Sequence, residues 1–190
     1  MFTSCLYSQT KLVSSRYQLE RASLGKDADK KELYAYHLVD DYHAFQKQIS
    51  DKHLERMSGD CPVFLSRDAE KTFGKSILSV LNRELSNEGK ERLAKNKHWI
   101  FVEMSIDGNG NLLFVELSSD WLMEEEINVK HISNILHQVK RIPISDIRPF
   151  QEDGYIRYTV VRRWLGVERT VFSGQVLLGK KVSTTAFQYQ

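Results

Sequence analysis

The residues best suited to binding chemistry lie near the end of the chain, where arginines and aromatic residues mix between positions 155 and 164. In an extended strand, alternate side chains point to opposite faces. One face would carry the mostly core-like set Ile156, Tyr158, Val160, Arg162 and Trp164, and the other Tyr155, Arg157, Thr159, Val161 and Arg163. Because arginine and aromatic side chains can grip a peptide or stack on bases, we select Tyr155, Arg157 and Arg163 as candidate partner-binding residues. A sheet with one solvated face is the alternative interpretation of this pattern.

Two short segments resemble phosphate-binding or nucleophile motifs but lack required parts. Gly74-Lys75-Ser76 is the ending of a phosphate-binding loop, yet Ala69 stands where the leading glycine belongs and the segment is expected inside a helix. Ser23-Leu24-Gly25-Lys26 fits a lysine-activated serine, but the supporting Ser-Asp-Asn and Lys-Thr-Gly elements are absent from the sequence. We interpret both as chance matches and predict no catalytic residues.

Metal and cofactor sites are not expected either. The segment from Asp107 to Asn111 superficially resembles a calcium loop, but Leu112 and Ser118 occupy the positions of the required glycine and glutamate. No His-Glu-x-x-His or comparable ligand spacing occurs in the sequence. His37 and Asp41, four residues apart, would form either an orienting pair for acid–base work or an ordinary helix-face contact.

The overall charge balance argues against a nucleic-acid partner. Lys and Arg total 27 against 25 Asp and Glu, for a formal net charge of +2, whereas nucleic-acid binding usually shows as a strongly basic domain. Basic residues exceed acidic ones after position 150 and the reverse holds between 101 and 150. This asymmetry indicates either neighbouring elements of complementary charge or an anion-binding face near the C-terminus.

The two cysteines and the first residues bear on the compartment. Cys5 and Cys61 fit neither a metal spacing nor a Cys-x-x-Cys pair, so one disulfide or two free thiols are both compatible with the sequence. Residues 1–9 read either as the end of a leader peptide or as a frayed terminus. In the first case Phe2-Thr3-Ser4-Cys5 resembles a lipoprotein cleavage box with Cys5 as the lipidated residue. We expect a periplasmic or envelope location in that case and a cytoplasmic one otherwise, with no transmembrane segment.

Hydrophobic periodicity predicts helices before the candidate strands. Leu38, Tyr42, Phe45 and Ile49 recur at helical spacing, which predicts a helix from Lys30 to about Met57. A second helix is predicted from an N-cap at Ser66 to about Ala94. A third is predicted after the possible N-caps Ser118, Ser119 and Asp120, with its apolar face at Ile132, Ile135, Leu136 and Val139.

Strand signals follow the second helix. Residues 99–106 and 112–117 are apolar and rich in β-branched and aromatic residues, and they flank Asp107-Gly108-Asn109-Gly110. Asp-Gly and Asn-Gly supply the positive φ angles of tight turns, so the pattern predicts a hairpin. Two more strands are predicted at Tyr155–Trp164 and Arg169–Leu178, turning around Gly166. The expected fold is α+β: N-terminal helices followed by ββαββ, with a mostly antiparallel four-stranded sheet and one helix packed on it.

Residues 98–164 resemble the C-terminal domain of the TonB family. The resemblance rests on a strand ending in Asp107-Gly-Asn-Gly110, a return strand ending in Ser118-Ser119, an amphipathic helix, a loop containing Pro143, and a closing strand. The long loop after the helix, the additional strand, and the missing Pro-rich spacer and membrane anchor depart from the family pattern. The resemblance implies a small envelope module that binds protein segments, often by strand addition at a sheet edge.

These observations lead to a functional hypothesis and its alternatives. We divide the chain into residues 1–9, a helical arm at 10–95 and a ββαββ domain at 96–190 that forms one cooperative unit with the arm. The leading hypothesis is a non-catalytic cell-envelope interaction module that binds a protein or peptide segment. The alternatives are a small hydrolase with a cleft between arm and sheet, and a cytosolic nucleic-acid-binding domain.

Overall fold

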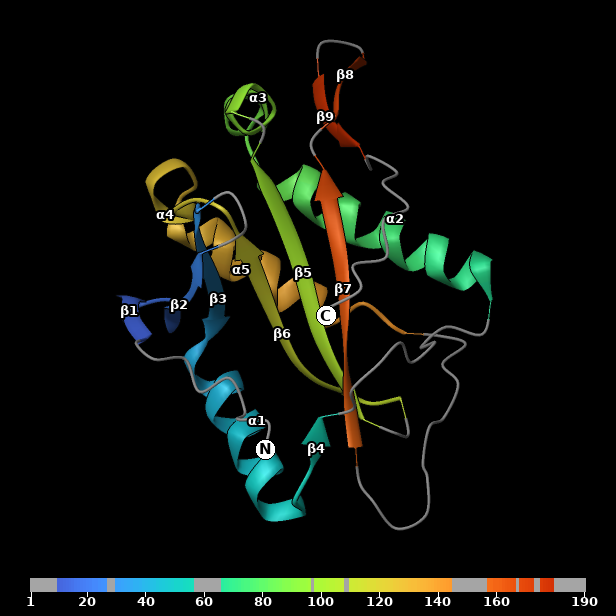
Figure 1. The fold of residues 1–190 in the computed structure, drawn as a ribbon. Helices are drawn as coiled ribbons and strands as arrows, with labels where there is room; N and C mark the ends of the chain where they lie inside the picture. Colours follow the sequence, from blue (N-terminus) through green and yellow to red (C-terminus); the bar gives the residue numbers. More distant parts are fainter. Residues whose placement is uncertain are drawn as a thin grey trace.

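The computed structural model describes residues 10–26, 30–56, 66–96, 98–107, 110–144, 157–166, 168–172 and 175–179. These residues form an α+β fold with five helices, a seven-stranded sheet in the order β1-β2-β3-β6-β5-β7-β4, and a separate β8-β9 ribbon (Figure 1). The strands are β1 (Thr10–Ser14), β2 (Leu19–Lys26), β3 (Glu32–Leu38), β4 (Glu55–Arg56), β5 (Trp99–Asp107), β6 (Leu112–Ser119), β7 (Arg157–Gly166), β8 (Glu168–Phe172) and β9 (Gln175–Gly179). The helices are α1 (Val39–Lys52), α2 (Arg67–Glu84), α3 (Asn87–Asn96), α4 (Met123–Glu126) and α5 (Val129–Val139).

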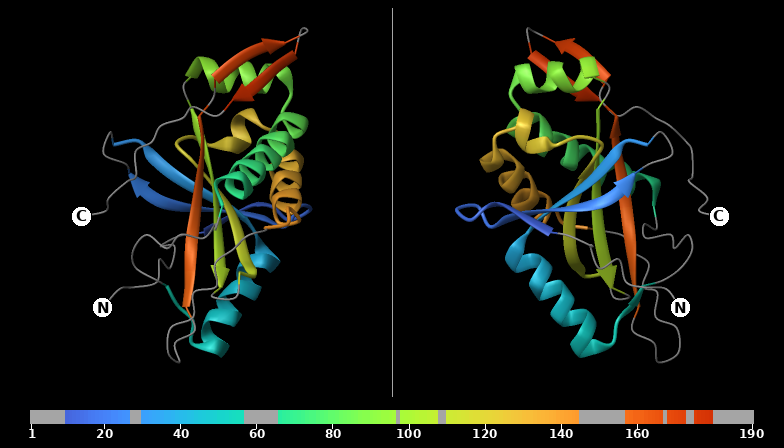
Figure 2. Two further views of the ribbon diagram at one scale, coloured as in Figure 1. Left: turned by 90° about the vertical axis from the view of Figure 1, so that its right-hand side faces the viewer. Right: turned by 60° about the vertical axis from the view of Figure 1, so that its left-hand side comes forward.

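Helices α2 and α5 cover one face of the seven-stranded sheet (Figure 2). The core between them is made by alternate sheet residues, among them Tyr36, Val102 and Leu117, and by the apolar stripes of both helices. Ile77 of α2 and Ile135 of α5 are completely buried. Burying a side chain of this size contributes roughly 1.5–3 kcal/mol, so this layer is the main source of stability. A smaller cluster joins α1 to β6 through Phe45, Leu54 and Phe114.

The hairpin predicted around Asp107 is confirmed. β5 and β6 pair antiparallel from Ile100↔Ser119 to Ile106↔Leu112. The Asp107 carboxylate accepts hydrogen bonds from the backbone N–H of Asn111 at 2.8 Å and from its side-chain amide at 2.9 Å. Gly110 has a φ of 88°, a left-handed conformation that glycine adopts without strain. The local turn chemistry was therefore sufficient to predict this element.

The prediction that helices open the fold is wrong, because three strands precede the first helix. β1, β2 and β3 form an antiparallel meander, and β3 pairs antiparallel with β6 through Tyr34↔Ser119 and Tyr36↔Leu117. Residues 32–38, assigned to a helix in the sequence analysis, are strand β3, and only Val39–Lys52 are helical. The helical spacing begins at Leu38, so it was correct for α1 but carried no information about the residues before it.

The second predicted helix begins as expected and ends early. The Ser66 side chain accepts a hydrogen bond from the backbone N–H of Ala69 at 3.1 Å, which confirms it as the N-cap of α2. Leu85 then has extended backbone angles and interrupts the helix. The Ser86 hydroxyl accepts from the backbone N–H of Gly89 at 3.0 Å and so caps the start of α3. One predicted helix is therefore two.

The third predicted helix also begins later than expected. Ser118 and Ser119 belong to β6, and the N-cap of α5 is Asn128, whose side chain accepts from the backbone N–H of Lys130 at 2.9 Å. A single turn, α4, comes before it. Within the described part of the chain, no helix is both long and apolar enough to cross a membrane.

The predicted four-stranded sheet is too small, and its last strand is placed differently. β7 pairs antiparallel with β5 along nine residue pairs, from Trp99↔Gly166 to Asp107↔Tyr158. The run predicted as the final strand, 169–178, folds back on itself as the β8–β9 ribbon, with Phe172↔Gln175 as its last pair. Residues 10–38, part of the predicted helical arm, supply strands to the same sheet as β5 and β6.

Candidate functional site

The structure places two of the three candidate binding residues on one strand. Arg157 is the first residue of β7 and Arg163 lies near its end. At about 3.3 Å per residue they are roughly 20 Å apart. Tyr155 and the possible lipidation site Cys5 lie outside the described residues. The arginines therefore mark the two ends of a strand and do not form one compact cluster.

One side of β7 is paired over only a fraction of its length. β5 borders one side of the strand completely, whereas β4 borders the other side through two parallel pairs, Glu55↔Arg157 and Arg56↔Tyr158. In the part of the chain that the structure describes, residues 159–166 therefore form a free sheet edge (Figure 1). A free edge presents unpaired backbone N–H and C=O groups to which another strand can add.

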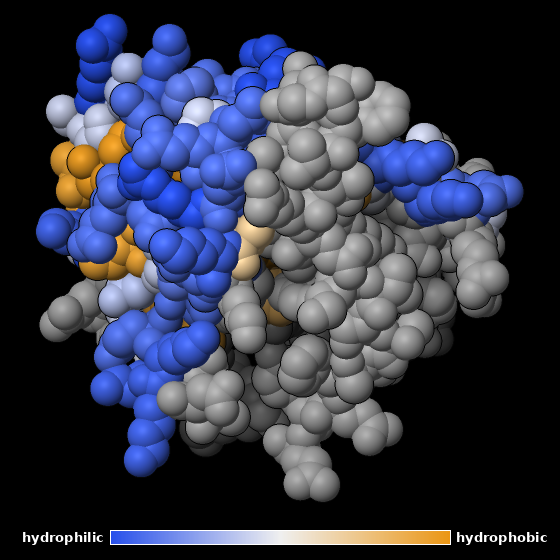
Figure 3. All heavy atoms as spheres, turned by 90° about the horizontal axis from the view of Figure 1, so that it is seen from above, coloured by the Kyte–Doolittle hydropathy of each residue, from blue (hydrophilic) through white to orange (hydrophobic). Residues whose placement is uncertain are grey.

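The opposite edge of the sheet, β1, is shorter and less regular. It has five residues, and its pairing with β2 shifts register between Leu12 and Ser14. Leu12 is 52% exposed, and Leu24 is also an exposed large hydrophobic residue. Seen from above, the described surface is mostly hydrophilic, and hydrophobic side chains gather mainly at the left margin, where β1 and α4 lie in Figure 1 (Figure 3). An irregular edge of this kind is a poorer template for strand addition than β7.

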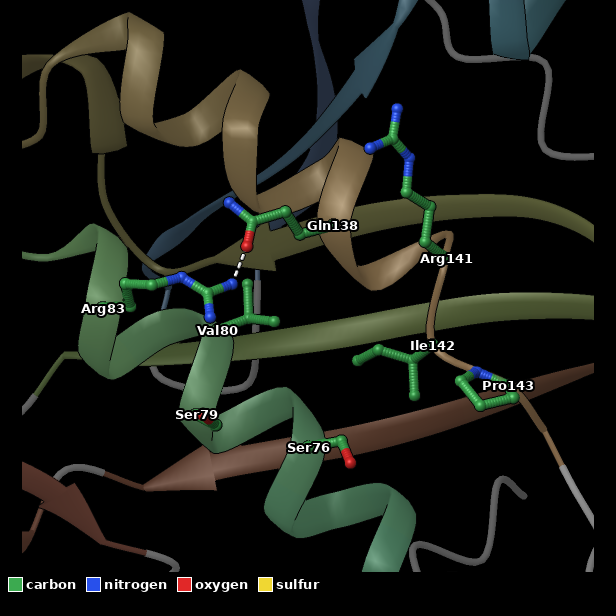
Figure 4. Close-up of a pocket in the computed structure, with 8 residues that line it drawn as sticks. All are labelled: Ser76, Ser79, Val80, Arg83, Gln138, Arg141, Ile142 and Pro143. Atoms are coloured by element: carbon green, nitrogen blue, oxygen red, sulfur yellow. Dashed lines mark hydrogen bonds between the residues drawn. The ribbon is translucent and has the colours of Figure 1, made fainter.

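An open groove of about 400 Å³ separates α2 from the end of α5 (Figure 4). Its lining comes from one stripe of α2 and from the last turn of α5 with the residues after it: Ser76, Ser79, Val80, Arg83, Gln138, Arg141, Ile142 and Pro143. The Arg83 guanidinium donates a hydrogen bond to the Gln138 side-chain oxygen across the groove (Figure 4). The described part of this lining holds two arginines and no carboxylate, and the Glu84 carboxylate lies 4.0 Å from Arg83 Nε.

Below the groove, Glu84 gathers three polar side chains of α5. His131 Nδ1 and Asn134 Nδ2 each lie 3.1 Å from Glu84 Oε2, and Gln138 Nε2 donates to Oε1. Burial by itself would raise the pKa of Glu84, but the hydrogen bonds from these three side chains outweigh it and hold the pKa below its usual value. Glu84 is therefore ionised at neutral pH and fixes the Gln138 amide with its oxygen towards Arg83.

Replacing Glu84 by Gln should lower the free energy of unfolding by about 1 kcal/mol at pH 7, because one charge-assisted network is lost. A carboxyl with a depressed folded-state pKa stabilises the fold above its unfolded pKa, and this contribution disappears as the pH falls through the folded value. The difference between wild type and Glu84→Gln, measured by urea denaturation, should therefore vanish in acid. A difference that stays constant down to pH 3 would contradict an electrostatic origin.

A second polar cluster lies where three segment ends meet. Asp120, just after β6, has a side chain only 1% exposed. Its carboxylate lies 3.3 Å from Lys31 Nζ, before β3, and 3.3 Å from His98 Nδ1, before β5. The His98 ring stacks on Trp121, with centroids 4.6 Å apart. This cluster ties the ends of three strands together through one buried carboxylate, which is a structural role.

The predicted His37–Asp41 pair does not form. His37 belongs to β3, where it is completely buried against Tyr42 and Phe114, and its Nε2 lies 3.6 Å from Glu20 Oε2. Asp41 instead accepts a hydrogen bond from Lys140 Nζ at 2.6 Å. Because the strand ends at Leu38, the two residues do not share a helix face, which the four-residue spacing had assumed.

The remaining motifs have structural explanations. Gly74, Lys75 and Ser76 lie within α2, where the Ser76 hydroxyl donates to the Thr72 carbonyl at 3.1 Å. Ser23 and Lys26 lie on β2. Among the described residues, no three His, Cys, Asp or Glu side chains are grouped as metal ligands. The groove residues Arg83, Gln138 and Arg141 were missed, although Ser76, Val80 and Arg83 stand at helical spacing on one stripe.

Comparison with known proteins identifies a similar fold. The chain resembles the crystal structure of a DUF5043 family protein from Bacteroides uniformis ATCC 8492, with a TM-score of 0.55 and 10% sequence identity. The similarity covers 87% of this chain and 90% of that one. No protein-family model and no curated protein matches the sequence. At 10% identity the likeness shows the fold alone.

Proposed function

We propose that this chain is a non-catalytic interaction module that binds an extended protein segment by strand addition along β7. The observation that carries the proposal is the edge at residues 159–166, which no other described strand covers and which continues beyond the two residues paired with β4. The pairing with β4 is an internal precedent, because the same edge already accepts a short parallel strand. A guest strand would extend the sheet from the point where β4 ends.

The sequence of the edge favours an acidic guest. Residues 159–166 read Thr-Val-Val-Arg-Arg-Trp-Leu-Gly, with a positive charge on each face of the strand and no acidic residue. Opposite charges on neighbouring strands contribute roughly 0.2–1 kcal/mol per pair, and like charges repel. Main-chain hydrogen bonds would supply the affinity, and Arg163 would select segments that carry glutamate or aspartate opposite it.

The location of the module is a separate matter. The resemblance of residues 98–164 to the TonB C-terminal domain motivates the envelope location and the mode of strand addition. Both stay predictions, as does lipidation of Cys5. The binding proposal rests on β7 and holds for either compartment.

A proline pair at adjacent positions of β7 tests the proposal. In an antiparallel pair, alternate residues direct their backbone N–H towards the partner strand, so one of Val160 and Val161 points its N–H at β5 and the other at the free edge. Val160→Pro and Val161→Pro are therefore matched variants. We expect one to lose the fold and the other to stay folded, because proline is tolerated at an edge. The folded variant should bind a guest strand about tenfold more weakly, since it lacks an N–H donor.

The probe is a fluorescein-labelled eight-residue peptide that alternates valine with glutamate, followed by fluorescence anisotropy. The same peptide with lysine in place of glutamate is the control for charge, and it should bind more weakly to the wild type. Circular dichroism separates the folded proline variant from the unfolded one. Equal binding of the glutamate peptide by the folded variant and the wild type would overturn the assignment to β7.

A further inference from the structure

The groove between α2 and α5 combines two guanidinium groups with hydroxyl donors and an apolar wall. Arg83 and Ser79 come from α2, and Arg141 follows the C-terminal end of α5. Val80, Ile142 and Pro143 supply the apolar part of the lining. The Glu84 carboxylate, 4.0 Å from Arg83 Nε, balances one of the two positive charges, so the described groove keeps a net positive charge through Arg141. A net positive charge attracts an anion, and the apolar wall suits a hydrophobic group attached to it.

Arg83 is held in place, whereas Arg141 is free to move. The hydrogen bond to Gln138 fixes one nitrogen of the Arg83 guanidinium, and Glu84 in turn fixes Gln138. Guanidinium carries five N–H donors, so Arg83 keeps donors for a ligand. The Arg141 side chain is exposed, makes no hydrogen bond or ion pair with the described residues, and is turned away from α2 (Figure 4). Exposed side chains change rotamer within nanoseconds, so Arg141 can turn over a bound anion.

We propose that this groove binds a phosphate group, preferably as the monoester of a small apolar molecule. Arg83 and Ser79 line the groove from α2, and Arg141 can turn towards it from the segment after α5. Together they would offer donors to all three terminal oxygens of a phosphate, whereas a carboxylate has only two oxygens to bind. The ester group lies against Ile142 and Pro143. This site is separate from the β7 edge and does not depend on the strand-addition proposal.

Isothermal titration of the full chain with phenyl phosphate tests the site, with inorganic phosphate and benzoate as comparison ligands. Phenyl phosphate should bind more tightly than inorganic phosphate, because of the apolar wall, and more tightly than benzoate, because of the third oxygen. Arg141→Gln should weaken phenyl phosphate about tenfold, since one charge-assisted interaction is lost. Lys47→Gln removes one positive charge from an exposed position on α1 and should change the affinity less than about twofold.

Three results would overturn the proposal: no heat of binding with phenyl phosphate, equal affinity in wild type and Arg141→Gln, or equal losses in Arg141→Gln and Lys47→Gln. The last result would mean that net charge alone attracts the anion. The Arg141 side chain has no partner in the described residues, so its substitution should leave the urea midpoint unchanged and the comparison interpretable. The folded β7 proline variant should bind phenyl phosphate as the wild type does, which keeps the two proposals distinguishable.

Discussion

Between pH 7 and pH 4 the wild-type chain should lose about 3 kcal/mol more of its unfolding free energy than the variant His37→Phe. Burial lowers the pKa of His37 from 6.5 to about 4, and the nearby charge of His43 adds to the effect. The unfolded chain therefore binds a proton in this window that the folded chain does not. Well above pH 6.5 the ring is neutral in both states, so the stability of the fold does not depend on its titration. As the pH falls towards 4, the unfolded chain binds the proton first, and the free energy of unfolding decreases.

The surroundings of His37 explain why its neutral form is favoured. Its ring is completely buried, with ring centroids 4.5 Å from Tyr42 on α1 and 5.9 Å from Phe114 on β6. Glu20 on β2 lies 3.6 Å from Nε2, and that carboxylate by itself would favour the protonated ring. Desolvation of a charge in such a site outweighs one partly exposed carboxylate. Phenylalanine fits the same aromatic surroundings and removes the proton-binding group.

Urea denaturation at pH 7, 6, 5 and 4 measures this effect. His137→Gln is the control, because His137 is exposed on α5 and its substitution should leave the pH dependence close to that of the wild type. If wild type and His37→Phe lose stability in parallel between pH 7 and pH 4, the buried ring is not the group that titrates.

Elements that depend on neighbouring residues could be predicted from the sequence. The turn from Asp107 to Asn111 and the capping of α2 by Ser66 each involve residues at most four positions apart. Short sequence patterns that occur in many folds specify these hydrogen bonds. The apolar face of α5 was found for the same reason, although its N-cap, Asn128, was not.

Elements that depend on distant partners were missed. Ala35, Tyr36, His37 and Leu38 are all buried, so β3 shows none of the alternation that marks a half-exposed strand. Its identity as a strand comes from pairing with β6, more than 80 positions away. The groove is a comparable case, because Arg83 lies on α2 and Arg141 follows α5. Periodicity describes one element at a time and does not reveal which elements meet.

Tyr36 provides one of these long-range contacts. Its buried hydroxyl accepts a hydrogen bond from the Met123 backbone N–H at 2.8 Å and donates one to the Glu124 carboxylate. Burial, followed by the hydrogen bond and the charge of Glu124, raises the pKa of Tyr36 well above its usual range, so the hydroxyl stays a donor. Arg21 on β2 forms an ion pair with the same carboxylate. The meander β2–β3 is thus attached to α4 through one phenol and one carboxylate.

Removing the Tyr36 hydroxyl as Tyr36→Phe should lower the free energy of unfolding by about 2 kcal/mol, because the Met123 N–H is left buried without its acceptor and Glu124 loses a donor. Tyr34→Phe is the matched control, because Tyr34 lies on the same strand and face. Its ring packs against Arg21, but its hydroxyl makes no hydrogen bond with the described residues. Tyr34→Phe should therefore lower the free energy of unfolding by less than about 0.5 kcal/mol. Urea denaturation at pH 7 compares the two.

In a double-mutant cycle, Tyr36→Phe should lower the free energy of unfolding less in a Glu124→Gln background than in the wild type, since the charge-assisted bond is already weakened there. Equal costs for Tyr36→Phe and Tyr34→Phe would show that ring packing, and not the hydroxyl, joins the strands to α4.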